Sequence, residues 1–526
     1  MTVAIPRVPT RPTPAARAGH RQWLALAVLF LPTLLVAVDN TILSFALPAI
    51  TTALSPSATT LLWMVDAYPL VLAGLLVTMG TIGDRVGSRR LLVIGVTGFG
   101  VVSLVATFAT DAVHLVAARA LLGFFGAMLM PSTLALVRTL FVDRDQRRLA
   151  LAIWATGFAA GAALGPLVGG ALLAHFWWGS VFLVNVPVTA LVVVLALFLL
   201  PESARVRRGR LDLGGVVLSM AAVVPVVLAV KLVASGGSVA MIATALAVGI
   251  GSGIAFVRRA RRLAATGREP VLDLRLLASP VLRIAMLANL TTMLALTGLL
   301  FFAAQYLQLV LGLGPMRSGV LLLPGFAATV VAGLVAAWLA RRFPIRVLVP
   351  TGLATAAAGY ALCVLLGAST GATLLLVAGV LVGAGIGLTE TLTNDVVLTA
   401  APVDRAGSAS AMSETAYELG AVLGTALLGG VLTAVYRRFV DAPAGPARET
   451  LGGAVDTADP TVIESARAAF ALGVDVTAGL GAVILAAMAL AAGIVLRRHT
   501  RPAASPAAVP AVVPAPEPER TAQSRN

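Results

Sequence analysis

Apolar runs of about twenty residues recur along almost the whole chain, and short arginine-rich segments separate many of them. A helix of about 20 apolar residues spans the core of a bilayer, so each run has the length of one membrane crossing. Of the 526 residues, 59% are hydrophobic and 12% are charged, whereas soluble domains carry about 25% charged residues. The sequence therefore predicts an all-α polytopic membrane protein.

Fourteen transmembrane helices are expected from these runs. They cover residues 23–48, 61–82, 91–109, 112–136, 148–173, 179–200, 213–233, 238–257, 282–311, 317–340, 346–367, 371–399, 408–436 and 473–496. The Pro- and Arg-rich start, residues 1–22, and the Pro- and Ala-rich tail, residues 499–526, are expected to be disordered.

Arginine is distributed unevenly between the loops that alternate along the chain. It clusters within residues 85–90, 144–148, 205–210, 258–268, 341–346 and 497–498, whereas the intervening short loops near 51–60, 174–178, 234–237 and 368–370 contain none. Cytoplasmic loops carry an excess of Lys and Arg, so both termini are predicted to be cytoplasmic. One longer loop, 437–472, is nearly neutral and is expected on the outer side.

The net charge of +15 comes almost entirely from arginine, because Lys231 is the only lysine. The arginines lie in loops that set the topology, which argues against a nucleic-acid partner. Cys363 is the only cysteine, which excludes an intramolecular disulfide and a multi-cysteine metal site. The four histidines are scattered, and no HExxH motif or phosphate-binding loop occurs. No metal, cofactor or ATP drive is therefore expected.

Two sequence patterns recur in the two parts of the chain. Residues 161–165, Gly-Ala-Ala-Leu-Gly, resemble residues 420–424, Gly-Ala-Val-Leu-Gly, and the run 333–346 loosely repeats 80–90. Both pairs correspond if the seventh and eighth helices are inserted between duplicated six-helix halves, a common transporter architecture. The expected domains are an N-terminal half at 23–205, two extra helices and a cytoplasmic linker at 206–270, and a C-terminal half at 271–498.

The loop after the second predicted helix contains a regular set of glycines and charges. Its residues are Gly80, Asp84, Arg85, Gly87, Arg89 and Arg90. Glycine permits a sharp turn and close helix contact, and Asp84 can bond an arginine or a helix N-terminus. The loop either only sets the topology or forms a charge latch between helices that breaks and reforms. Its spacing resembles the signature loop of the major facilitator superfamily.

The fifth predicted helix carries small residues at intervals of four. The set is Gly157, Gly161, Gly165, Pro166, Gly169 and Gly170. Small residues at this spacing form a groove in which another helix packs closely, and proline permits a bend. Helix packing explains part of the pattern, while the Gly-Pro pair with the following Gly-Gly resembles the antiporter motif of drug-exporting facilitators.

Three further segments resemble the 14-span drug:proton antiporters, the QacA-like family within that superfamily. They are residues 38–48, 177–187 and 405–420, and Ser44 departs from the family pattern, which usually has Asn. The resemblance extends from residue 23 to about 496. It implies the major facilitator fold, with two six-helix halves and two inserted helices, in a bacterial-type cytoplasmic membrane, and it implies coupling to protons.

Several ionisable residues lie within the apolar helices. A charge at the bilayer centre costs about 2.5–3.5 kcal/mol on insertion scales, so it usually faces a cavity or a partner. The candidate proton-coupling or substrate-binding residues are Asp39, Asp66, Arg119, Glu390, Glu414 and Glu418. The resemblance links Arg119 to proton transfer. Glu390 and Asp395 lie in a polar stretch toward the inner end of the twelfth predicted helix, where both can be near cytoplasmic water. Lys231 is expected to extend to the outer membrane surface.

The alternative for each of these residues is a structural ion pair, such as Arg119 with an acid, or an interfacial position. As a mechanism, we expect membrane-embedded carboxylates to hold protons and, when ionised, to attract cations. A proton and a cationic substrate that compete for one negative charge produce antiport.

The sequence therefore predicts a monomeric, proton-coupled exporter of lipophilic drugs, cationic ones foremost. The nearest alternative is export of an endogenous antibiotic, lipid or peptide by the same mechanism. The antiporter motif argues against uptake by proton symport, and the missing catalytic motifs argue against an enzyme or a receptor.

Overall fold

The computed structural model describes residues 18–202, 212–234, 236–266, 274–367, 371–400 and 406–499. These residues form helices and no strand. The α-helices are α1 (His20–Leu54), α2 (Ala58–Val86), α3 (Ser88–Thr107), α4 (Ala112–Leu140), α5 (Arg144–His175), α6 (Ser180–Leu183), α7 (Asn185–Leu199), α8 (Leu213–Ala234), α9 (Val239–Ala265), α10 (Pro280–Gln305), α11 (Pro315–Leu339), α12 (Ile345–Cys363), α13 (Ala372–Ala400), α14 (Ala406–Leu423), α15 (Gly430–Phe439), α16 (Pro446–Glu449), α17 (Leu451–Val455) and α18 (Pro460–His499). A short 3₁₀-helix η1 (Leu274–Ala278) and two π-helical turns, η2 (Tyr306–Val310) and η4 (Gly424–Gly429), complete them.

Capping side chains mark where several helices begin. Ser57, Asp111, Asp143, Ser238 and Ser279 each accept a hydrogen bond from a backbone N–H in the first turn of the following helix. These caps satisfy donors that would otherwise be unpaired at a helix end.

Fourteen helical segments of the described chain are long and apolar enough to cross a membrane, which confirms the predicted number. The predicted start of the last of these helices is wrong. It begins at Pro460 rather than at 473, so the outer connection covers only residues 440–459 and contains α16 and α17. The added turns are charged, and they are held by polar contacts: Asp459 accepts from the backbone N–H of Thr461, and Arg467 Nε donates to the carbonyl oxygen of Leu309 over 2.9 Å.

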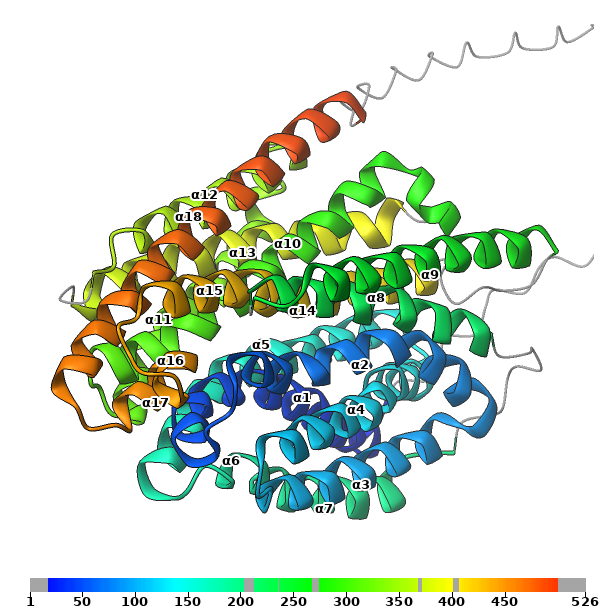
Figure 1. The fold of residues 1–526 in the computed structure, drawn as a ribbon. Coiled ribbons are helices and arrows are strands. Elements are labelled where there is room, and N and C mark those ends of the chain that lie inside the picture. Colours follow the sequence, from blue (N-terminus) through cyan, green and yellow to red (C-terminus); the bar gives the residue numbers. More distant parts are fainter. Residues whose placement is uncertain are drawn as a thin grey trace, which may run out of the picture.

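The two predicted halves have the same internal helix packing. The pairs α1–α5, α2–α4, α3–α4 and α3–α7 recur as α10–α14, α11–α13, α12–α13 and α12–α18. In Figure 1 most helices of the first half, blue to cyan, lie below most helices of the second half, green to orange-red. This packing agrees with the expected arrangement of two six-helix halves with two inserted helices.

The recurring glycine pattern has the same structural role in both halves. A Cβ at Gly161 would lie 2.6 Å from the carbonyl oxygen of Leu34, and a Cβ at Gly420 would overlap the carbonyl oxygen of Leu290. In each case glycine lets the fifth helix of its half approach the first. The exact domain boundaries stay a prediction, and part of the 206–270 linker lies outside the described residues.

The two halves touch at the end of the molecule opposite Ala18 and His499, the first and last described residues, and we call this end the distal end. There, Gln308 Nε2 donates to the carbonyl oxygen of Phe45 over 3.2 Å, and Glu449 accepts from the backbone N–H of Ala58 over 3.1 Å. Gly452 of α17 packs against Thr51 of α1. The distal end is therefore closed in this conformation.

Candidate functional site

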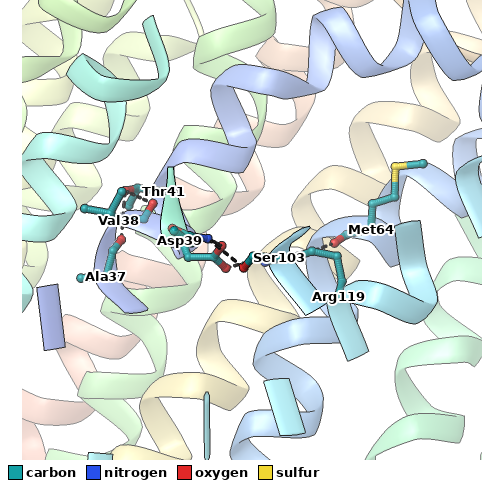
Figure 2. A network of polar contacts seen from close by, with 8 residues as sticks. Ala37, Val38, Asp39, Thr41, Met64, Ser103 and Arg119 are labelled. Atoms are coloured by element: carbon teal, nitrogen blue, oxygen red, sulfur yellow. Dashed lines mark hydrogen bonds and ion pairs between the residues drawn. The ribbon is translucent and has the colours of Figure 1, made fainter. Parts of the chain in front are cut away.

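A buried ion pair joins α1 to α4 in the first half. Arg119 Nη1 contacts Oδ2 of Asp39, and the two side chains are 1% and 0% exposed. The Arg119 guanidinium also lies 4.5 Å from the Tyr68 ring centroid, and its Nε donates to the carbonyl oxygen of Met64. Figure 2 shows Arg119 with Asp39 and Met64. For Arg119 the sequence left two interpretations open, a part in proton transfer or an ion pair with an acid. The ion pair is present, and the part in proton transfer stays a prediction.

The other oxygen of Asp39 is held by an amide. Asn185 Nδ2 donates to Asp39 Oδ1 over 3.1 Å and to Ser103 Oγ over 3.3 Å. Asn185 begins α7, Ser103 lies on α3 and Arg119 lies on α4. Three helices therefore help to position the Asp39 carboxylate of α1. The sequence marked Asn185 only as part of a motif, although an amide in an apolar helix is itself a signal of a buried partner.

Asp66 of α2 pairs with a residue that the sequence placed elsewhere. Lys231 Nζ of α8 lies 2.8 Å from Asp66 Oδ2, and both side chains are 0% exposed. The expectation that Lys231 extends to the outer membrane surface is therefore wrong. The ion pair with a carboxylate of α2 and the Trp63 ring, 3.8 Å from Nζ, hold the ammonium inside the protein instead.

Three carboxylates of the second half gather between α13 and α14. Glu390 and Glu414 lie near enough to repel each other when both are charged, and the same holds for Glu414 and Glu418. Thr292 donates a hydrogen bond to Glu390 Oε1 over 3.3 Å, and Glu418 is 5% exposed with no hydrogen bond to Oε2. None of the ion pairs between described residues includes any of the three.

The carboxylate cluster reaches the first half through Tyr68. The Tyr68 ring lies within electrostatic reach of both Asp39 and Glu418, and its hydroxyl is buried without a hydrogen-bond partner. Beside the cluster, Asn289 Nδ2 donates to Asn394 Oδ1 and to Ser413 Oγ, both over 2.9 Å. The structure thus brings Glu390, Glu414 and Glu418 together, and Tyr68 lies within electrostatic reach of both Glu418 and Asp39.

Two acids stand apart from these groups. Asp395 is exposed and belongs to no described ion pair, in keeping with its predicted place toward water. Asp475 of α18 is partly buried, and its Oδ1 lacks a hydrogen-bond partner. Asp475 is not among the sequence candidates because the predicted helix began at 473, which put this acid at a helix end.

Two arginines of the motif loop after α2 form ion pairs with Glu202, which follows the end of α7. Arg90 Nε lies 2.9 Å from Glu202 Oε1, and Arg89 Nη1 lies 3.9 Å from Glu202 Oε2. Gly87 has φ of 103°, a backbone conformation that favours glycine, and it makes the turn from α2 into α3. A Cβ at Gly80 would touch Pro131 at 3.4 Å, Arg85 is half-buried, and the side chain of Asp84 is not among those described.

The glycine stripe of α5 faces two helices. Gly157, Gly161, Gly165 and Gly169 pack against α1, where a Cβ at Gly157 would lie 3.2 Å from Thr33. Near the distal end, Gly170 packs on Pro315 and Met316 of α11, and the Pro166 carbonyl lies against Gly319. The same stripe therefore fills the contact within the first half and the contact with the second half.

Comparison with known proteins gives a consistent result. Residues 29–425 match the family model described as Major Facilitator Superfamily. The chain is 48% identical over 496 residues to the multidrug efflux pump LfrA of Mycolicibacterium smegmatis, an alignment that covers 92% of this chain and 98% of that protein. It is 36% identical over 470 residues to the methyl viologen resistance protein SmvA of Salmonella typhimurium, covering 86% and 93% of the two chains.

A puromycin resistance protein of Streptomyces alboniger, pur8, is 35% identical over 434 residues, with 82% of this chain and 85% of that protein covered. Among solved structures, a bacterial homologue of the human lysosomal transporter Spinster superimposes with a TM-score of 0.65 at 17% identity, covering 93% of this chain and 100% of the other. At this identity the likeness concerns the fold.

Proposed function

Because the chain belongs to the major facilitator superfamily, we propose that it exports lipophilic drugs, cationic ones foremost, in exchange for protons across the cytoplasmic membrane. It is a many-span membrane transporter. The relatives named for multidrug efflux and for resistance to methyl viologen and puromycin support drugs as its cargo.

The observation that carries the proposal is the charge imbalance between the halves. In the first half Asp39 is paired with Arg119 and Asp66 with Lys231, so each embedded acid has a cation. In the second half three carboxylates lie together, and none of them belongs to a described ion pair. A carboxylate that is shielded from water and has no cation beside it favours its protonated form, so this cluster is expected to bind protons or a cation from outside the protein.

Exchange follows from the mutual exclusion of the two occupants. A cation that binds the ionised cluster displaces its protons, and protons that return release the cation. Tyr417 of α14 lies within electrostatic reach of all three carboxylates and provides an aromatic ring beside them, which favours lipophilic cations. Each charge that moves across 100 mV is worth about 2.3 kcal/mol, so a membrane potential and a proton gradient can drive export.

The arginine distribution supports an orientation in which the end with the termini faces the cytoplasm. The closed distal end then faces outward. Rocking of one half against the other is the usual way in which such folds change access.

The test is transport by purified protein in liposomes that contain a pH-sensitive dye. Ethidium added to a vesicle with an imposed proton gradient should move against its own gradient while protons move the other way. Glu418→Gln should lower this exchange at least about ten-fold, a factor equivalent to about 1.4 kcal/mol. Asp395→Asn, which removes an exposed acid of α13, serves as the matched control and should keep it. Ethidium transport that continues after a protonophore has collapsed the gradient would contradict proton coupling.

A further inference from the structure

Helix α8, the first of the two inserted helices, touches both halves of the transporter. It packs against α2 of the first half and against η4 and α15 of the second. Val227 is fully buried with Leu70 of α2 and with Val422 and Ala426 of the second half. Gly74 permits the close approach, because a Cβ there would overlap the side chain of Met220. The inserted pair is thus attached where the halves meet (Figure 1).

At this place α8 contributes one cation to a site made by other helices. The Lys231 ammonium lies 2.8 Å from Asp66 Oδ2 and 3.8 Å from the Trp63 ring centroid. The Thr425 hydroxyl of η4 lies close to the Asp66 carboxylate. Carboxylate and ring therefore come from α2, the hydroxyl comes from the second half, and both charged side chains are 0% exposed.

A carboxylate beside the face of a tryptophan is a receptor for organic cations. Aromatic faces attract ammonium and guanidinium groups, and the attraction grows when water is excluded. The lysine ammonium is a compact charge on a flexible four-carbon stem, so it can enter and leave such a site without movement of the helix. Here the receptor is filled by a cation of the chain itself.

We propose that Asp66, Trp63 and Thr425 form a subsite for the positive group of a cationic substrate, and that Lys231 occupies this subsite as a tethered competitor when no substrate is bound. The inference rests on the proposed export of cations. In the empty transporter the lysine balances the charge of Asp66. When a substrate cation arrives, the lysine moves aside, and the inserted helix thereby sets the affinity of the subsite.

A purely structural ion pair leads to the opposite expectation. If Lys231 only fastens α8 to α2, its loss should leave substrate affinity unchanged or lower it, because the site would be disturbed. If Lys231 competes, its loss should free the carboxylate and the ring, and binding should tighten. The sign of the change therefore separates the two roles.

The experiment measures ethidium binding by fluorescence polarisation with the purified full-length protein in detergent. Lys231→Gln should bind ethidium at least about ten-fold more tightly than the wild type, whereas Asp66→Asn should bind it more weakly. In the Asp66→Asn background Lys231→Gln should bring no tightening. Arg259→Gln, which removes a positive charge of the same inserted pair at an exposed ion pair with Asp212, is the matched control and should bind as the wild type does.

A second measurement needs no variant, because Lys231 is the only lysine of the chain. Its labelling by an amine-selective reagent, followed by mass spectrometry of the peptide that contains it, should become faster when ethidium is bound. Unchanged or tighter protection of Lys231, or unchanged or weaker ethidium binding by Lys231→Gln, overturns the inference while the exporter proposal stands. A wild type that neither binds nor transports ethidium contradicts both.

Discussion

At the scale of single residues, the embedded charges fall into two kinds. Asp39 and Arg119 balance each other within the first half, and Asn185 holds the second oxygen of Asp39. Removing one partner of a buried pair leaves an uncompensated charge, which is strongly destabilising, whereas removing both can be nearly neutral. Among the described residues no ion pair balances Glu390, Glu414 or Glu418, so a neutral replacement there removes a charge that no described cation compensates.

The first prediction concerns the Asp39–Arg119 pair. Asp39→Asn should lower the free energy of unfolding by about 3–5 kcal/mol, because Arg119 then stays buried without its carboxylate, and transport should be lost. The double variant Asp39→Asn with Arg119→Gln should recover most of the thermal stability but no transport. The measurement is the melting temperature in detergent beside ethidium transport in liposomes.

Asp212→Asn provides the matched control for stability. It removes the acid of an ion pair whose arginine, Arg259, is 43% exposed while Asp212 itself is 7% exposed. Because water reaches the arginine, which is then not left as a buried charge, the cost should be well below that at the fully buried pair. If Asp39→Asn proves as stable as this control and still transports ethidium, the buried pair is neither a structural nor a functional requirement.

The sequence located the membrane-embedded acids but not their partners. Apolar surroundings revealed Asp39 and Asp66, since a lone charge in such a run is expensive. The partner of Asp66, however, lies 165 positions further along the chain, and no local pattern connects the two. Lys231 sits one turn from the end of α8, where long basic side chains commonly extend to the surface, and only the packing of α8 on α2 reverses that expectation.

At the scale of helices, the glycines of α5 determine how closely the first half packs. Thr41 lies against Gly165 in the first half, and Thr297 lies against Gly424 in the second. Counting back two residues from each threonine makes Ala295 the counterpart of Asp39. The Ala295 carbonyl accepts a hydrogen bond from Tyr360 instead. The halves therefore share their packing but not their charges, which explains why a repeated glycine pattern could be predicted and the placement of the ion pairs could not.

The second prediction concerns this packing. Gly161→Ala would bring a Cβ to 2.6 Å from the Leu34 carbonyl oxygen, so α1 and α5 must separate. Overpacking of this kind costs about 1–3 kcal/mol, and we expect a lower melting temperature together with slower ethidium transport. Gly251→Ala on α9 is the matched control, because a Cβ there meets nothing within 4 Å. If the two variants have the same melting temperature and the same ethidium transport, Gly161 is not required for the close packing of α1 and α5.

At the scale of the whole molecule, the closed distal end distinguishes this conformation from the one that releases cargo. The halves touch there through Gln308 with Phe45, through Glu449 with Ala58 and through Gly452 with Thr51. Residues 440–459 contribute two of these contacts, so the outer connection is part of the closure. If the halves rock against each other, all of these contacts must separate in each transport cycle.

The last prediction tests that movement with a cross-link. Thr51→Cys with Gly452→Cys places two thiols where α1 and α17 touch, and the native Cys363 is buried and does not compete. Oxidation should stop ethidium transport, and reduction should restore it, because the disulfide holds the distal end closed. Asp441→Cys with Ser465→Cys is the matched control: the Asp441 backbone N–H lies 2.8 Å from Ser465 Oγ, and both residues belong to the second half at the same end of the molecule. That cross-link should leave transport intact. Full transport by the oxidised Thr51–Gly452 pair would mean that cargo crosses without opening of the distal end, which is incompatible with two halves that rock around a central site.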